Sequence, residues 1–123
     1  MPGTGTSQVK EEKCIFCKIG RGEVPAELLY RDDAFFAIRD IQPKVPVHVL
    51  IIPFDHVGAL AGEPQARFQD LGGMIAAAAS VAKQLGVEEE GYRLVINQGP
   101  QSGQEVPHLH LHLLAGRRLG PMG

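Results

Sequence analysis

Three histidines alternate with leucines near the C-terminal end of the chain. The segment reads Pro107-His108-Leu109-His110-Leu111-His112-Leu113-Leu114. Successive side chains of a β-strand point to opposite faces, so the histidines would share one face and the leucines would face the core. Imidazole titrates near neutral pH, coordinates metal ions and attacks electrophiles when it is neutral. The spacing therefore predicts a row of reactive or metal-binding histidines on one strand.

Two other interpretations of this histidine row are possible. A merely solvated polar face is disfavoured, because three of the five histidines in the chain fall in this one stretch. A three-histidine zinc enzyme is the second alternative, although three ligands from one strand rarely converge on one ion. The loop before the strand favours phosphate chemistry: Gly99, Pro100, Ser102 and Gly103 are expected to leave backbone N–H groups accessible and to form an anion-binding concavity.

The two cysteines of the chain, Cys14 and Cys17, form a Cys-x-x-Cys pair. In a reducing compartment this spacing indicates a metal site or a redox pair more than a structural disulfide. Two cysteines supply half of a tetrahedral zinc site, so further ligands would have to come from elsewhere in the chain.

The pattern of apolar runs and turn residues predicts an α+β domain. A short helical turn is expected at Cys14–Gly20, and the one long helix is expected at Pro64–Leu85, with Gly86 as its stop. Most of the strands are joined by short turns, which favours an antiparallel sheet carrying a helix. The five strands are expected at Glu27–Arg31, Ala34–Asp40, Val47–Pro53, Tyr92–Asn97 and His108–Ala115.

Length and charge limit the possible functions. The 123 residues suffice for one domain, and the net charge of −2 without a basic block gives no reason to expect binding of a nucleic-acid polymer. No apolar run reaches transmembrane length, so no membrane partner is expected. The polar start lacks the apolar core of a signal peptide, and the cytoplasm is the expected location. We expect a flexible tail at 1–13, one domain at 14–118 and a C-terminal tail at 119–123.

The chain resembles the histidine triad (HIT) family, whose motif of three histidines separated by apolar residues matches residues 108–114 at every position. The likeness extends from Cys14 to Arg118, and Ala115-Gly116-Arg117 is similar to the Gly-Gly-Arg of the Hint branch. That branch contains purine nucleoside phosphoramidases. Further matching segments, in the expected order, are Ile15-Phe16, Lys18-Ile19, Asp40-Ile41-x-Pro43, His48 with Ile51-Ile52-Pro53, and Tyr92-Arg93-x-Val95-x-Asn97.

The resemblance implies a role for each matching residue. His110 would attack the α-phosphorus through Nε2 and form a nucleotidyl-histidine that water hydrolyses, and His112 would donate to phosphate oxygens. His48 and His108 would lie in the same catalytic pocket, and Asp40 would accept from the ribose hydroxyls. The purine of an AMP or GMP derivative would lie between the apolar side chains of Ile15, Phe16, Ile38 and Ile41. The phosphate or leaving group would be held by Asn97 and by the loop residues Gly103, Gln104, Glu105 and Val106.

The resemblance also implies a metal and a partner. Several bacterial family members bind a structural zinc, for which the corresponding ligands here are Cys14, Cys17, His56 and His108. Members of the family form homodimers through the long helix and the strand near Tyr92–Asn97, which gives one ten-stranded sheet. Pairing of this kind would satisfy the exposed edge of a five-stranded sheet.

Two departures from the family pattern concern the leaving group. Relatives commonly carry a hydroxyl residue where this chain has Glu105, and the tail from Leu119 to Gly123 lacks the aromatic residue of some relatives. Three functions remain as alternatives: a nucleoside phosphoramidase, a dinucleoside polyphosphate hydrolase, and a nucleotide- or zinc-binding regulatory module with little turnover. The intact His110 disfavours the third, and the Ala115-Gly116-Arg117 ending favours the first over the second.

Overall fold

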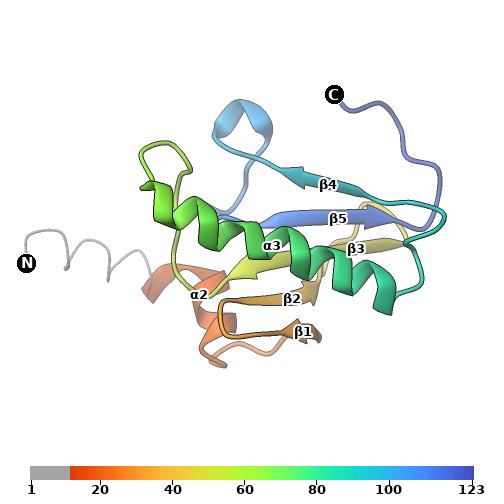
Figure 1. The fold of residues 1–123 in the computed structure, drawn as a ribbon. Helices are drawn as coiled ribbons and strands as arrows, with labels where there is room; N and C mark the ends of the chain where they lie inside the picture. Colours follow the sequence, from red (N-terminus) through yellow and green to blue (C-terminus); the bar gives the residue numbers. More distant parts are fainter. Residues whose placement is uncertain (1–11) are drawn as a thin grey trace, which may run out of the picture.

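Figure 1 shows the computed structural model, which describes residues 12–123, so the tail expected at 1–13 lies almost wholly outside the described residues. Five strands form one antiparallel sheet in the order β1-β2-β3-β5-β4. The elements are α2 (Ile15–Gly20), β1 (Leu28–Arg31), β2 (Phe35–Arg39), β3 (Val47–Pro53), α3 (Gln65–Gln84), β4 (Arg93–Ile96), the 3-10 turn η1 (Pro100–Ser102) and β5 (Leu111–Ala115).

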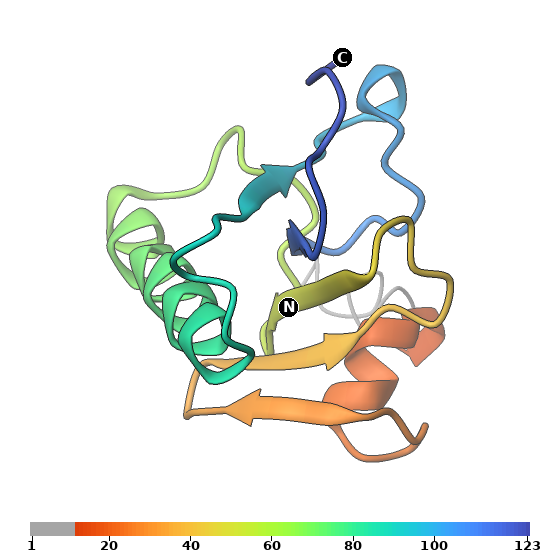
Figure 2. The same ribbon diagram turned by 90° about the vertical axis from the view of Figure 1, so that its right-hand side faces the viewer.

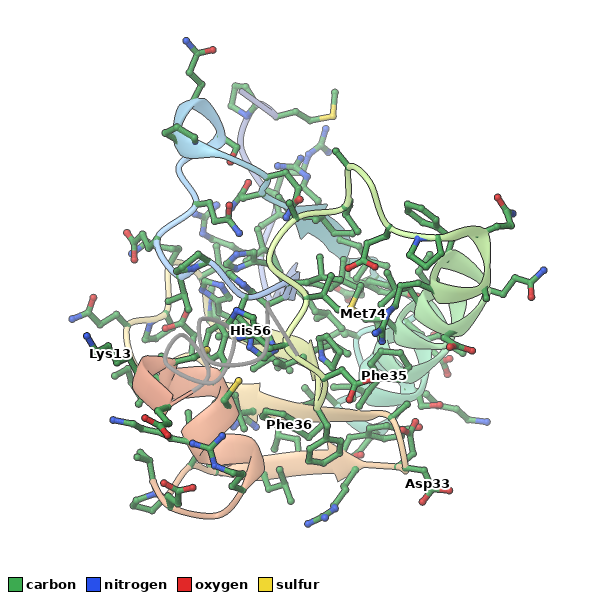
Figure 3. All side chains as sticks on the ribbon, turned by 90° about the vertical axis from the view of Figure 1, so that its left-hand side faces the viewer. Lys13, Asp33, Phe35, Phe36, His56 and Met74 are labelled. Atoms are coloured by element: carbon green, nitrogen blue, oxygen red, sulfur yellow. The ribbon has the colours of Figure 1, made fainter. Side chains whose placement is uncertain are left out.

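The two helices cover opposite faces of the sheet, as Figure 2 shows. Strands β2 and β3 are buried on both faces, which explains why their sequences read as nearly continuous apolar runs. Figure 3 shows this division at two neighbouring residues: Phe35 lies beside Met74 of α3, whereas Phe36 lies on the side of α2. The expected α+β fold, with an antiparallel sheet, one long helix and a short N-terminal helix, is confirmed.

The long helix α3 packs one stripe of its surface on the sheet. At Gly73 the helix lies close to the sheet, because an added Cβ would lie 3.0 Å from Cε2 of Phe35. Gly86, with φ of 73°, follows the helix and ends it in the left-handed region, as expected. None of the helices in residues 12–123 is long and apolar enough to cross a membrane. The buried stripe comprises Leu71, Met74, Ala77, Ala78, Val81 and Ala82.

The last strand begins three residues later than the sequence indicated. Strand β5 starts at Leu111, whose partner on β3 is Ile51, rather than at His108. Beyond this pair β3 reaches Pro53, which has no N–H to donate to a continued ladder. The backbone N–H of Leu109 donates instead to the carbonyl of Val57, at 2.6 Å. The triad segment therefore enters the sheet from a loop, yet it keeps the alternation of faces that was predicted.

Candidate active site and metal centre

The triad histidines lie on the α2 side of the sheet, and the leucines between them lie on the α3 side. Leu109, Leu111 and Leu113 are buried in the core beneath α3. His108 and His110 are buried, and His112 is half-buried. His48 comes from β3 and is buried beside His112, with the two ring centroids 5.2 Å apart. The predicted row of histidines on one face is therefore present.

His110 is held with one ring nitrogen bound and the other available. Its Nδ1 lies 2.7 Å from the carbonyl oxygen of His108. A carbonyl can only accept, so Nδ1 carries a hydrogen, and Nε2 is the nitrogen left for other contacts. The Phe16 ring meets His110 edge-on, with centroids 5.0 Å apart. This arrangement fixes the orientation of the ring and leaves Nε2 available for chemistry.

His48 and His112 are directly hydrogen-bonded, with His48 Nε2 2.9 Å from His112 Nδ1. Burial lowers the pKa of His48, and the nearby Asp40 carboxylate opposes that shift. Burial also lowers the pKa of His112 to about 4, and repulsion from His110 and His48 acts in the same direction. Both rings are consequently neutral at neutral pH. The second nitrogen of His112, Nε2, is buried and has no partner among the described residues.

The loop from Asn97 to Val106 is closed by its own hydrogen bonds. Gly99 N–H donates to Oε1 of Gln104 at 2.8 Å, and the N–H groups of Ser102 and Gly103 donate to carbonyls within the same loop. The expectation that these glycine and serine N–H groups are open to an anion is therefore wrong, because the Gln104 side chain and the 3-10 turn η1 use them. A nucleotide contact at Gly103 would have to use other atoms. Nε2 of Gln104 is buried without a partner among residues 12–123.

The residues expected to bind a nucleotide differ in exposure. Ile41 is 93% exposed and Ile15 is 40% exposed, whereas Phe16 of α2 and Ile38 of β2 are buried in the core between α2 and the sheet. Asp40 turns inward, since one carboxylate oxygen accepts from the backbone N–H of Gln42 and the other lies 3.4 Å from His48 Nε2. Asn97 is half-buried, and Glu105 and Val106 are exposed and half-buried, respectively.

Four predicted metal ligands meet at the start of α2. The donor atoms of Cys14, Cys17, His56 and His108 all lie within 4.8 Å of one another. Cys14 Sγ lies 3.2 Å from His108 Nδ1, and Cys17 Sγ lies 3.3 Å from His56 Nδ1. Figure 3 shows His56 close to α2, which carries Cys17. Two thiols and two imidazoles are a donor set typical of structural zinc.

The orientation of His108 supports this donor set. Its Nε2–H donates to the carbonyl of Pro53 at 2.9 Å, so Nδ1, which faces the cysteines, keeps its lone pair. Burial lowers the pKa of His108 to about 4, as a neutral metal ligand requires. A backbone carbonyl behind a ligating imidazole is a common way to fix its tautomer. Both ring nitrogens of His108 are thus engaged by protein atoms, and its link to His110 runs through its carbonyl oxygen.

A second group of candidate ligand atoms, from Asp40, His48 and His112, also lies within 4.8 Å. The short contact between His48 Nε2 and His112 Nδ1 is a hydrogen bond, and Asp40 lies at its side. A hydrogen between the two ring nitrogens occupies the space that an ion would need. These three residues therefore form a hydrogen-bonded network.

A model of the HIT domain matches residues 21–119. The chain belongs to the HIT domain family. It is 48% identical to the purine nucleoside phosphoramidase of Escherichia coli over 111 residues. The aligned residues cover 90% of this chain and 93% of that protein. It is 42% identical to the 14 kDa zinc-binding protein of Zea mays, over 91% of this chain and 88% of the relative.

A solved structure of a HIT family hydrolase from Clostridium thermocellum has the same fold. It superposes with a TM-score of 0.85 and 46% sequence identity, covering 89% of this chain and 96% of the other. The recognition of a HIT domain and of an enzyme of this family is thereby confirmed. Sequence reasoning missed the backbone partners of the histidine rings, at Pro53, His108 and Lys44, because a backbone group leaves no signal in residue type.

The HIT domain has a separate pocket of about 310 Å³ between the C-terminal end of α2 and Phe54. The guanidinium of Arg31 lies over the Phe54 ring, 5.1 Å from its centroid. The walls also include Ile19, Leu28 and Phe36, and they contain no histidine, cysteine or serine.

Proposed function

We propose that this HIT protein is a nucleoside phosphoramidase in which Nε2 of His110 attacks the α-phosphorus. The hydrogen bond from His110 Nδ1 to the carbonyl of His108 carries the proposal, because it uses Nδ1 and leaves Nε2 of this buried ring as the nitrogen that can attack. The name of the Escherichia coli relative, a purine nucleoside phosphoramidase, supports the substrate class.

The reaction would proceed in two displacements. His110 Nε2 forms a bond to phosphorus as the P–N bond of the phosphoramidate breaks, and the amine leaves with a proton from water. Water then attacks the phosphorus of the nucleotidyl-histidine, the N–P bond breaks, and a nucleoside monophosphate is released. Splitting one difficult step into two easier ones is the general advantage of a covalent intermediate.

The other site residues would bind and orient the nucleotide. The buried His112 Nε2 has no partner within residues 12–123, and a phosphate oxygen would satisfy it. Asp40 would meet the ribose hydroxyls, and the loop from Gly103 to Val106 with Asn97 would hold the phosphate. The purine would lie against the apolar side chains, of which Ile15 and Ile41 are accessible and Phe16 and Ile38 form the wall behind them.

The test of the nucleophile is a trapped intermediate. Wild-type protein mixed with an adenosine phosphoramidate and quenched without acid should gain one adenylyl mass on the peptide that holds residues 108–114. His110→Ala should lose this label and essentially all turnover, while nucleotide affinity stays within about tenfold, because the binding contacts remain. His112→Asn is the matched control, since it keeps the nucleophile and should still acquire the label. A label on another peptide, or a substantial kcat in His110→Ala, would refute the mechanism.

We also propose a structural zinc held by Cys14, Cys17, His56 and His108. The name of the maize relative, a zinc-binding protein, supports the metal. Zinc would supply a covalent clip between the segment before α2 and the triad segment, with four protein ligands and no open position for water. The reduced state of the cysteines that this requires is consistent with the proposed cytoplasmic location.

A homodimer is the third proposal. Helix α3 exposes Phe68 and Ile75, at 44% and 57%, and β4 at the edge of the sheet exposes Ile96 at 38%. Gly72 and Ala79 lie at helical spacing with these exposed side chains and would allow a close approach. A second copy would cover this surface and pair the two β4 edges into a ten-stranded sheet.

A further inference from the structure

We propose that the backbone N–H of Lys44 sets the protonation pattern of the His48–His112 pair. It keeps a hydrogen on Nε2 of His112 and opposes a second proton on Nδ1 of that ring. Lys44 lies in the loop between β2 and β3, and any residue except proline would supply the same backbone N–H at this position.

The pattern follows from one donor that cannot change direction. Lys44 N lies 3.1 Å from Nδ1 of His48, and a backbone amide can only donate. Nδ1 of His48 is therefore an acceptor, and the hydrogen of this neutral ring is on Nε2. That hydrogen points to His112 Nδ1 at 2.9 Å, with Asp40 Oδ2 at a longer 3.4 Å.

His112 inherits its tautomer from His48. Because Nδ1 of His112 accepts the His48 hydrogen, the single hydrogen of the neutral His112 ring is on Nε2. This nitrogen is the buried atom without a partner among residues 12–123. The series of hydrogen bonds that runs from the Lys44 amide through the two imidazoles thus ends at the Nε2–H of His112, a donor without a partner among the described residues.

A second proton on His112 would disrupt this series of hydrogen bonds. It would put hydrogens on both His112 Nδ1 and His48 Nε2, which face each other at 2.9 Å. His48 could relieve this clash only by moving its hydrogen to Nδ1, where the Lys44 N–H already donates. Protonation of His112 therefore breaks a buried hydrogen bond, in addition to placing a charge in a buried site.

The charged and titratable groups that face His112 are His110, His48, Asp40 and Lys44. The two histidines and the Lys44 ammonium disfavour an imidazolium, and the Asp40 carboxylate alone favours it. The pKa of about 4 for His112 is consistent with this balance. Under the proposed function, on which this consequence rests, His112 is a hydrogen-bond donor to a phosphoryl oxygen that retains its proton throughout the reaction.

The direct test uses NMR of the uniformly ¹⁵N-labelled wild-type protein. Nitrogen–nitrogen couplings across hydrogen bonds should connect the amide of Lys44 with His48 Nδ1, and His48 Nε2 with His112 Nδ1. The imidazole spectra should give the Nε2–H tautomer for both rings at pH 7. A hydrogen on Nδ1 of either ring would overturn the proposal, whatever the enzyme's substrate proves to be.

Two substitutions at one position isolate the backbone group. Lys44→Pro removes the N–H and the ammonium, whereas Lys44→Ala removes only the ammonium. The pKa of His112 should rise in Lys44→Pro by about one unit beyond its value in Lys44→Ala, the size expected for one net hydrogen bond. Equal pKa values in the two variants would overturn the proposal. If Lys44→Pro does not fold, the wild-type couplings and tautomers still decide it.

Failure of the proposed phosphoramidase activity has a different signature. It would leave the NMR couplings intact while adenosine phosphoramidate is not turned over and no adenylyl-His110 forms. Conversely, a labelled His110 together with an Nδ1–H tautomer of His112 would retain the proposed function and reject the role of Lys44.

Discussion

Acid should destabilise this protein through His112, and His112→Asn should remove that sensitivity. The folded-state pKa of His112 is lowered from 6.5 to about 4, mainly by burial. A group with a depressed pKa binds fewer protons in the folded than in the unfolded chain, so its contribution falls as the pH drops. The loss begins near pH 6.5 and is complete below pH 4.

The size of the effect follows from the two pKa values. Between pH 7 and pH 5 the unfolded chain protonates this histidine and the folded chain hardly does. At 1.36 kcal/mol for each pKa unit, linkage gives a loss of about 1.5 to 2 kcal/mol from this one residue over that interval. For a domain with a total stability of about 5 to 15 kcal/mol, such a loss is readily measured.

The assay is urea unfolding at pH 7 and pH 5, with the metal content and the protein concentration held constant. In His112→Asn the amide oxygen can still accept the His48 Nε2–H, and the variant lacks the titrating ring. The unfolding free energy of the wild-type protein should therefore fall by about 1.5 to 2 kcal/mol more than that of the variant. Equal losses in the two proteins would show that His112 is not held neutral by its surroundings, and the reasoning would fail.

The remaining predictions concern the metal and the dimer. Protein purified without a chelator or an affinity-tag metal should contain about one zinc per chain, and Cys17→Ser should lower both the zinc content and the melting temperature. Less than about a tenth of an equivalent, with activity unchanged after chelation, would contradict a structural zinc. Light scattering at micromolar concentration should give a dimer, which Ile75→Glu dissociates and Ser80→Glu, at another exposed position of α3, does not. A wild-type monomer would refute the interface.

The alternation of residues 107–114 was sufficient to predict which side chains share a face. A two-residue period survives the irregular entry into β5, because Leu109 bonds to Val57 while its side chain still points to the α3 core. The apolar run of β3 and the helix that follows Pro64 were predictable for the same reason. Burial of one face dictates residue type at a regular spacing, and that regularity is visible in the sequence.

The chemical state of the histidines was not predictable from the sequence. Which nitrogen of His108 carries a hydrogen depends on the carbonyl of Pro53, 55 residues away, and which nitrogen of His48 does so depends on the amide of Lys44. Every residue except proline offers both backbone groups, so nothing in the sequence marks the ones that are used. The prediction of an anion site in the loop before the triad was wrong for a related reason. The glycines that make N–H groups accessible also let the loop fold back, so that these N–H groups donate to acceptors within the loop.

His108 connects the proposed metal centre with the proposed nucleophile, His110, and the two roles use different atoms. Its ring faces the cysteines through Nδ1 and Pro53 through Nε2, while its carbonyl accepts the His110 Nδ1–H. A ligand that holds the His108 ring also restrains the backbone on which the His110 tautomer depends. His112 is held by different hydrogen bonds, which run through His48 to the Lys44 amide. The proposed nucleophile and the proposed phosphate donor are thus held by different hydrogen bonds, so a change at the cysteines should affect His110 first, while Lys44→Pro should first affect His48 and His112.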